Sequence, residues 1–216
     1  MLESIIAGDG ARLIWSQSDG VGFLEVANED VYDEAYFERY RALSQTPMAA
    51  ALNDFRARLT MKHAALGVDH ILDVGIGDGA FLRRLEQLQA PPSIRVSGCD
   101  VNPAGIAYLI ERGQLWSLED GADLVTFWDS LEHIRDPRAA LEGARVCAIV
   151  SIPIFGSVEH VLASRHYRPD EHYWYFTRQG FLDFADRQGF YCVDVLATET
   201  ALGRDGIETF VLKRRV

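Results

Sequence analysis

The sequence predicts an α/β protein: a doubly wound, mostly parallel sheet with an antiparallel C-terminal hairpin and helices on both faces. Three observations support this prediction. Between residues 71 and 188, short apolar runs alternate with helical stretches, and repeated β–α units form parallel sheets. Three glycines at alternate positions follow the first apolar run, Ile71–Val74. Two later runs, Tyr191–Thr198 and Glu208–Lys213, flank Gly203–Gly206 as the arms of a hairpin would.

The first residues of the chain predict a separate β-hairpin. Ala11–Gln17 and Val21–Ala27 have the composition of short strands, and the dipeptide Asp19-Gly20 between them is a strong hairpin signal. We therefore expect residues 1–30 to form a small appendage and residues 31–216 to form one domain.

Two helices are predicted between the hairpin and the first apolar run, over Asp33–Leu43 and Pro47–Leu66. In the first helix, Tyr32, Tyr36 and Tyr40 recur at a spacing of four residues and share one face. Such a stripe is typical of plain packing, and it would also serve to cover a ligand from the N-terminal side.

The remaining elements follow in β–α order. The predicted strands are Ile71–Val74, Ile94–Cys99, Ala122–Phe127 and Val146–Ile154, and the predicted helices are Gly79–Gln89, Pro103–Arg112, Pro137–Arg145 and Thr177–Gln188. Pro at the first turn of the second helix and Thr177 as an N-cap agree with known helix-start preferences.

Composition narrows the class of protein. Of the 216 residues, 48% are hydrophobic and 25% charged, enough for a packed core. The formal net charge of −11 and the lack of a long basic run argue against nucleic acid or an anionic membrane as partner. No apolar stretch reaches membrane-spanning length and no signal peptide is recognisable, so we expect a cytoplasmic protein. The three cysteines, Cys99, Cys147 and Cys192, contain no CxxC pair and are expected to be buried thiols.

The glycine-rich turn is the most informative segment. It reads Asp73-Val-Gly75-Ile76-Gly77-Asp-Gly79-Ala80 between a strand and a helix. Glycines let a ligand approach the backbone, and the helix N-terminus favours a carboxylate or phosphate. The spacing also fits the dinucleotide fingerprint GxGxxA, which leaves an NAD-type cofactor open. Asp73 favours a cationic ligand, and the sulfonium and ammonium of S-adenosylmethionine fit that charge.

Asp100 closes the next predicted strand, where a carboxylate can accept hydrogen bonds from both ribose hydroxyls of either cofactor. The alternative is that Asp100 caps the helix Pro103–Arg112, a role that Asn102 could fill instead.

Residues 123–137 favour one of these cofactors. The glycine turn, Asp100 and the triplet Leu131-Glu132-His133 after a Leu-Val strand resemble the class I S-adenosylmethionine-dependent methyltransferase superfamily, which has a Rossmann-like sheet. Within it, they resemble the ubiquinone-biosynthesis O-methyltransferases and related bacterial methyltransferases, over about residues 30–200. The chain is shorter between Asp100 and Asp123 than the resemblance leads us to expect, so a third strand would be compressed into about Gln114–Leu118.

The resemblance implies a set of cofactor-binding residues. The turn would hold the methionine part of S-adenosylmethionine, Asp100 and its neighbours the ribose, the segment after Gly113 the adenine, and a tryptophan the sulfonium, whose charge the ring face attracts. Together with the residues argued above, the expected cofactor contacts are Asp73, Gly75, Ile76, Gly77, Asp100, Val101, Asn102, Trp116, Ser117 and Trp128.

The resemblance also raises the question of a metal. Some relatives bind magnesium through residues matching Asp129, Glu132 and His133, and many others carry the same triplet without a metal. Two carboxylates suit a hard cation, whereas histidine is a less usual ligand for it. We therefore assign no metal ligand and leave magnesium open as a second cofactor. His133 is a candidate general base for an acceptor hydroxyl, or a structural residue.

A histidine-rich stretch follows the fifth predicted strand. His160, His166 and His172 are six residues apart, a spacing that does not fit a metal site. The step from His172 to Thr177 resembles a histidine–aromatic–Phe-Thr pattern of the same family. We expect residues 155–176 to form an insertion over the acceptor pocket, with His172 as a second candidate catalytic residue, or a loop whose aromatics only pack on the body.

The sequence thus predicts methyl transfer from S-adenosylmethionine to a small-molecule acceptor, with oxygen favoured over nitrogen or carbon. The chemistry would be an in-line displacement for which the protein supplies alignment and a dry site. Two alternatives stay open: an NAD-type oxidoreductase that uses the turn from Gly75 to Ala80, and a non-catalytic binding protein of the same fold. The sequence names neither the acceptor nor the oligomeric state.

Overall fold

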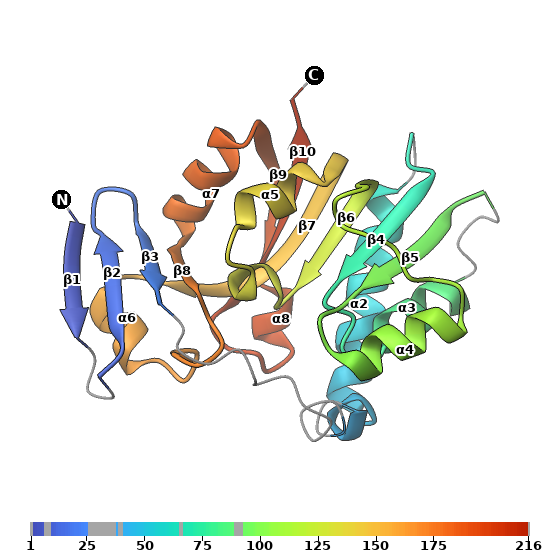
Figure 1. Cartoon of the computed structure of the whole chain (residues 1–216), viewed down its shortest axis with the longest axis horizontal. Coiled ribbons are helices and arrows are strands. Elements are labelled where there is room, and N and C mark those ends of the chain that lie inside the picture. Colours follow the sequence, from blue (N-terminus) through green and yellow to red (C-terminus); the bar gives the residue numbers. More distant parts are fainter. Residues whose placement is uncertain are drawn as a thin grey trace.

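The computed structural model describes residues 2–6, 10–25, 38, 41–64, 67–88 and 93–215. Ten strands form one mixed sheet in the order β1-β2-β3-β8-β7-β6-β4-β5, and β10 pairs with β7 and β9. Figure 1 shows the strands side by side across the molecule, from β1 near the N-terminus to β5 at the opposite end. This is the predicted mostly parallel α/β fold with antiparallel strands, and the prediction is confirmed.

The central strands are parallel. They are β4 (His70–Val74), β5 (Arg95–Cys99), β6 (Ala122–Trp128) and β7 (Ala144–Phe155). Their carboxyl ends point toward the lower side of Figure 1. The terminal hairpin pairs β9 (Phe190–Leu196) with β10 (Ile207–Arg214), and β10 runs antiparallel to β7.

Helices cover both faces of these strands. On one face, α2 (Pro47–His63), α3 (Ala80–Gln87) and α4 (Pro103–Glu111) pack over a core that includes Leu82, Leu124 and Ile149. On the other face, α5 (Pro137–Glu142) and α7 (Arg178–Arg187) pack over Phe127, Val150 and Phe181. Neighbouring residues of one strand therefore serve opposite cores, as the two-residue period of a strand requires.

The N-terminal strands continue this sheet. β1 (Leu2–Ile6), β2 (Arg12–Ser16) and β3 (Val21–Leu24) are antiparallel, and β3 pairs with β8 (Trp174–Thr177). β8 pairs in turn with the last residues of β7. Together with α6 (Val158–Ala163), these strands enclose a third core around Trp15 and Tyr175. The division into residues 1–30 and 31–216 remains a prediction, and the sheet is continuous across it.

Three further predictions have structural outcomes. The expected third strand at Gln114–Leu118 is a single parallel bridge between Gly98 and Leu115. The tyrosine stripe at Tyr32, Tyr36 and Tyr40 lies outside the described residues. Within the described ranges, none of the helices has both the length and the apolar character needed to cross a bilayer.

Candidate active site

The glycine-rich turn joins β4 to α3 at the carboxyl end of the sheet. Gly75, Gly77 and Gly79 have φ angles of 78°, 56° and 76°, in the region that favours glycine. A Cβ atom on Gly75 would lie 2.9 Å from the Cβ of Ser130, and one on Gly79 would lie 2.6 Å from the Tyr108 ring. These two glycines therefore let Ser130 and Tyr108 pack closely against the turn. At Gly77 no atom lies within 4 Å of an added Cβ, so the backbone there is open to a ligand such as a carboxylate near the N-terminus of α3.

Asp100 stands beside this turn at the end of β5. Its carboxylate accepts hydrogen bonds from the backbone N–H of Gly77 (3.2 Å) and of Asn102 (2.8 Å). Burial raises the pKa of Asp100, and the surrounding backbone N–H groups oppose that rise. Asn102 caps α4 through the N–H of Ala104, so the cap does not require Asp100. The adjacent Val101 side chain is 73% exposed, an apolar surface free to cover a ligand.

Asp73 lies beneath the turn rather than on it. The side chain is 2% exposed and accepts a 2.7 Å hydrogen bond from the Thr126 hydroxyl. Burial raises the pKa of Asp73 to about 7. Its charge near neutral pH therefore depends on what cation the site above it holds.

The two predicted cofactor tryptophans already make ring contacts within the protein. The guanidinium of Arg56 stands 5.0 Å from the Trp128 ring centroid, and Phe81 meets the ring edge-on. Arg95 lies 3.9 Å over the Trp116 ring, whose Nε1 donates to the carbonyl of Gly121. The Ser117 hydroxyl accepts from the N–H of Glu119. The contacts of Trp116, Ser117 and Trp128 with a cofactor remain predictions.

The two predicted catalytic histidines meet in the structure. Glu132 and His133 lie on a 3-10 turn after β6 (η1, Leu131–His133), and His172 precedes β8. The N–H of Tyr173 donates to the carbonyl of Glu132 and joins the two segments. The imidazole rings lie edge to face with their centroids 4.5 Å apart. Ligand atoms of Glu132, His133 and His172 all lie within 4.8 Å of one another.

Burial shifts the pKa of each residue in the trio formed by Glu132, His133 and His172. It raises the pKa of Glu132 well above its usual range, with a further rise from the Asp129 charge. It lowers the pKa of His133 and, more strongly, that of His172. Near neutral pH, both imidazoles are therefore neutral and able to accept a proton.

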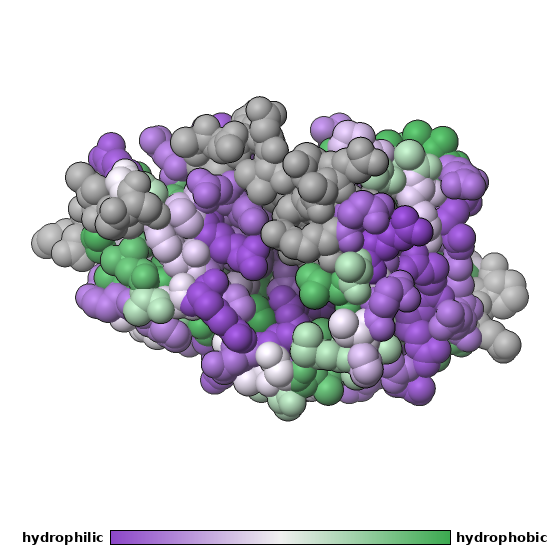
Figure 2. All heavy atoms as spheres, turned by 90° about the horizontal axis from the view of Figure 1, so that it is seen from below, coloured by the Kyte–Doolittle hydropathy of each residue, from purple (hydrophilic) through white to green (hydrophobic). Residues whose placement is uncertain are grey.

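Buried polar atoms without hydrogen-bond partners gather in this region. Five such side-chain atoms occur among the described residues, and four are Trp128 Nε1, Ser130 Oγ, Glu132 Oε2 and His172 Nδ1. Buried polar groups are nearly always paired, so an unpaired cluster needs an explanation such as an absent ligand. The carboxyl-end side of the sheet is hollowed near its middle, with largely hydrophilic residues around the hollow (Figure 2).

The donor set fits one class of metal better than another. Asp129, which the resemblance places with Glu132 and His133, instead accepts hydrogen bonds from Arg56 and Arg204. His172 occupies the third position. Two imidazoles and one carboxylate suit zinc or another borderline metal, whereas magnesium prefers an all-oxygen set. The residues present therefore fit magnesium poorly.

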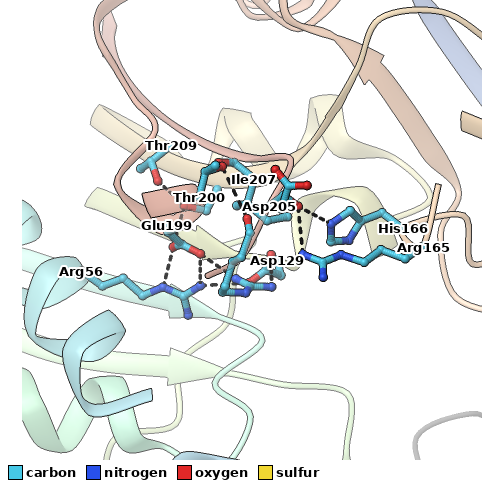
Figure 3. Close-up of polar contacts among 11 residues, drawn as sticks. Arg56, Asp129, Arg165, His166, Glu199, Thr200, Asp205, Ile207 and Thr209 are labelled. Carbon is cyan, nitrogen blue, oxygen red and sulfur yellow. Dashed lines mark hydrogen bonds and ion pairs between the residues drawn. The ribbon is translucent and has the colours of Figure 1, made fainter. Parts of the chain in front are cut away.

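Three residues that were not predicted from the sequence surround Asp129: Arg56, Glu199 and Arg204. These four residues form what we term the charge cluster (Figure 3). Arg56 comes from α2, and Glu199 lies on the short helix α8 (Thr198–Ala201), inside the connection predicted only as the turn of a hairpin. No sequence signal pairs these distant residues, although an arginine within the alanine-rich helix α2 could have drawn attention.

The chain is similar to known methyltransferases in its sequence family and in its fold. A family model described as a methyltransferase domain matches residues 32–195. No curated protein sequence matches the chain. The chain resembles the structure of magnesium protoporphyrin IX methyltransferase from Synechocystis PCC 6803 with bound S-adenosylhomocysteine, at 14% identity and a TM-score of 0.62, covering 86% of this chain and 97% of that one.

Two further structures are similar at the level of the fold. A SAM dependent methyltransferase from Aquifex aeolicus has 16% identity and a TM-score of 0.58, covering 83% of this chain and 98% of that one. A putative O-methyltransferase from Nostoc punctiforme PCC 73102 has 17% identity and a TM-score of 0.60, covering 88% of this chain and 64% of that one. Identities this low establish a shared fold only.

Proposed function

The chain belongs to the methyltransferase domain family, and from that premise we propose that it transfers a methyl group from S-adenosylmethionine to a hydroxyl of a small-molecule acceptor. The observation that carries the proposal is the set of four unpartnered buried polar atoms on the segment from Trp128 to Glu132 and on His172. A cofactor and an acceptor bound there would supply the missing partners.

On the cofactor side, the backbone of Gly75, Ile76 and Gly77 and the N-terminus of α3 would receive the methionine carboxylate. Asp100 would accept hydrogen bonds from the ribose hydroxyls, and the exposed side chain of Val101 would cover the adenosine. Asp73, ionised once a cation is bound above it, would balance the sulfonium and ammonium charges. The related structure solved with bound S-adenosylhomocysteine supports this choice of donor.

On the acceptor side, His133 or His172 would take the proton of the acceptor hydroxyl as its oxygen attacks the methyl carbon. The new O–C bond forms as the C–S bond breaks, and the sulfonium becomes a neutral thioether. Both imidazoles are neutral and therefore able to accept a proton. His133 is the stronger base of the two, because its pKa is lowered less than that of His172. Residues 156–173, which carry His172 over the site, would exclude water from the reaction.

A second role for the trio has a specific observation in its favour. Glu132, His133 and His172 have the separation needed to hold one metal ion. A bound metal would act as a Lewis acid that lowers the pKa of the acceptor hydroxyl. These three side chains would hold the ion, and the charge cluster would keep Asp129 out of its coordination shell.

Calorimetric titration with S-adenosylhomocysteine tests the proposed cofactor. We expect wild-type protein to bind it, and Gly77→Arg and Asp100→Ala to weaken binding at least about 100-fold, a loss of about 2.7 kcal/mol. Gly113→Arg is the matched glycine control, since Gly113 also has a positive φ and no atom within 4 Å of an added Cβ.

Asp123→Ala is the matched carboxylate control, because Asp123 accepts from the backbone N–H groups of Asp69 and His70 at the opposite end of the strands. Binding of NAD without binding of S-adenosylhomocysteine would instead support an oxidoreductase. Equal affinities in wild type, Gly77→Arg and Asp100→Ala would contradict the assigned pocket.

A further inference from the structure

The charge cluster is a largely buried, balanced set of two guanidinium groups and two carboxylates, in which Glu199 is fully buried and the other three side chains are 13–25% exposed. Arg56 donates to both carboxylate oxygens of Glu199, at 2.7 and 2.8 Å, and to Asp129 at 2.9 Å. Arg204 donates to both oxygens of Asp129, at 2.5 and 2.9 Å, and to Glu199 at 2.6 Å. The Glu199 side chain is fully buried and also accepts from the Ser151 hydroxyl.

Stability alone is a weak explanation for such a cluster. Moving four charges out of water is costly, and apolar residues of similar volume are often as stable in place of a buried ion pair. Burial by itself would raise the pKa of Asp129, but the charges of Arg204 and Arg56 lower it to about 2. Asp129 is therefore ionised throughout the physiological range and fixed by three hydrogen bonds.

The backbone of Asp129 is unusual. Its φ of 56° is the one positive value at a non-glycine position among the described residues. Positive φ is uncommon for a residue with a Cβ atom, although aspartate adopts it more often than most such residues. Its N–H donates to the carbonyl of Ser151, and its carboxylate accepts from Arg56 and Arg204, so these contacts together can fix the conformation.

The strained residue sits in the middle of the candidate site. Trp128 precedes it, and Ser130, Glu132 and His133 follow it within four residues. Three of the four unpartnered polar atoms lie on this short segment. A different backbone angle at residue 129 would turn these side chains away from the glycine turn and from His172.

We propose that Arg56, Glu199 and Arg204 are positioning residues that hold Asp129 in its left-handed conformation and thereby aim the segment from Trp128 to His133 at the cofactor and the acceptor. The inference rests on the proposed function for the identity of these two ligands. Glu199 acts indirectly: it holds both arginines in place and offsets one of their two charges.

The same connection reaches the segment over the site. The carbonyl of Asp205, next to Arg204, accepts hydrogen bonds from His166 Nε2 (2.7 Å) and from Arg165 (3.3 Å) (Figure 3). The residues between α8 and β10 thus contact Asp129 on one side and the loop that carries His172 on the other.

The substitution Asp129→Gly distinguishes a positioning role of the charge cluster from direct contact between the Asp129 carboxylate and a ligand. Glycine adopts positive φ without strain, so it needs no charge cluster to hold it. The double variant Arg204→Met/Asp129→Gly removes one charge of each sign and leaves the Arg56–Glu199 pair balanced. A positioning role predicts that the second substitution rescues the first, whereas a carboxylate that itself binds the ligand predicts no rescue.

The experiment measures S-adenosylhomocysteine affinity by calorimetry and the environment of Trp128 by fluorine NMR of protein labelled with 5-fluorotryptophan. We expect Arg204→Met to weaken binding about tenfold and to shift or broaden the Trp128 signal. The double variant should bind within about threefold of wild type with a wild-type Trp128 signal. Arg178→Met, which breaks the exposed Arg178–Glu208 pair, is the matched control and should change neither quantity.

An unchanged Trp128 signal in folded Arg204→Met protein, or a double variant that binds no more tightly than Arg204→Met, would overturn the positioning role. Arg204→Lys, which keeps the charge but loses the paired donors, replaces Arg204→Met if that variant does not fold. Wild-type protein that binds no S-adenosylhomocysteine would defeat the proposed function, and the Trp128 signals of the same variants would still decide the positioning role.

Discussion

The two halves of the candidate site are built in different ways. The cofactor half consists mainly of backbone: one turn with three positive-φ glycines and the carboxylate of Asp100 at the end of the next strand. The acceptor half consists of side chains from η1, the loop before β8, α2 and the connection before β10. The cofactor half comes from a short stretch of sequence. The acceptor half forms only when segments that are distant in the chain pack together.

This difference determines how each half tolerates change. A backbone turn is sensitive to any side chain that alters its φ angles, whatever the chemistry of that side chain. A side-chain cluster is sensitive to the loss of particular partners, because each buried charge or donor left behind is costly. Three measurements separate these sensitivities.

The largest effect on S-adenosylhomocysteine affinity is expected at Gly75, where the cofactor half contacts Ser130 of the acceptor half. Gly75→Val places a β-branched residue at a φ of 78°, with its Cβ only 2.9 Å from that of Ser130. We expect a loss of more than about 100-fold in S-adenosylhomocysteine affinity by calorimetry, since both the turn and the segment of Ser130 must move. Gly67→Val is the control: it has a similar φ of 74° and nothing within 4 Å of an added Cβ. Equal affinities in the two variants would show that the halves are independent.

An intermediate effect is expected from metal ions on the acceptor half alone. Zinc at 100 times its dissociation constant should stabilise the protein by about 2.7 kcal/mol, seen as a rise in melting temperature. Magnesium should do much less, because the trio offers two imidazoles. Glu132→Gln and His172→Phe should remove the zinc effect, whereas His160→Phe, at an exposed histidine, should keep it. A zinc response that survives Glu132→Gln would rule out the trio as its origin.

The smallest effect is a pH dependence of the cofactor half. Since burial raises the pKa of Asp73 to about 7, the carboxylate becomes protonated as the pH falls from 8 to 6. S-adenosylmethionine affinity should then fall, by up to about tenfold per pH unit below that pKa. S-adenosylhomocysteine, which has no sulfonium charge, should lose less. Asp73→Asn should flatten both profiles, and a slope that persists in this variant would assign the titration to another group.

The raised pKa of Asp73 also makes the stability of the ligand-free protein depend on pH. The folded pKa of Asp73 lies above its usual value of 3.8. Its contribution to stability is therefore fully present below about pH 3.8 and is lost as the pH rises through about 7. Urea unfolding should show Asp73→Asn gaining stability relative to wild type at pH 8 and keeping only part of that advantage at pH 5.

Local patterns in the sequence were sufficient for the fold class and for the glycine-rich turn between β4 and α3. Apolar runs bounded by glycines predicted the central strands, and Pro103 and Thr177 marked helix starts that the structure retains. The third strand was overestimated, because the short chain between α4 and β6 leaves room for only the single bridge at Leu115. The assigned roles of the site residues remain predictions to be tested by binding.

The acceptor half could not be predicted in the same way. His133 and His172 were candidates on separate grounds, but their contact depends on the parallel pairing of β7 with β8. Arg56 on α2 and Glu199 on α8 are 143 positions apart in the chain and meet only once the whole domain has folded. Nothing in the local sequence of either residue specifies that partner.

β7 is twelve residues long and has different neighbours along its length. Most of it pairs with β6 and β10, and its last residues pair with β8, whose outer side is covered by β3. A chain shortened past Leu24 would keep every residue of the candidate site and yet leave Trp174, Tyr175 and Phe176 on an unprotected strand edge. Unpaired strands of that kind recruit other chains, so we expect a chain shortened in this way to self-associate through β8.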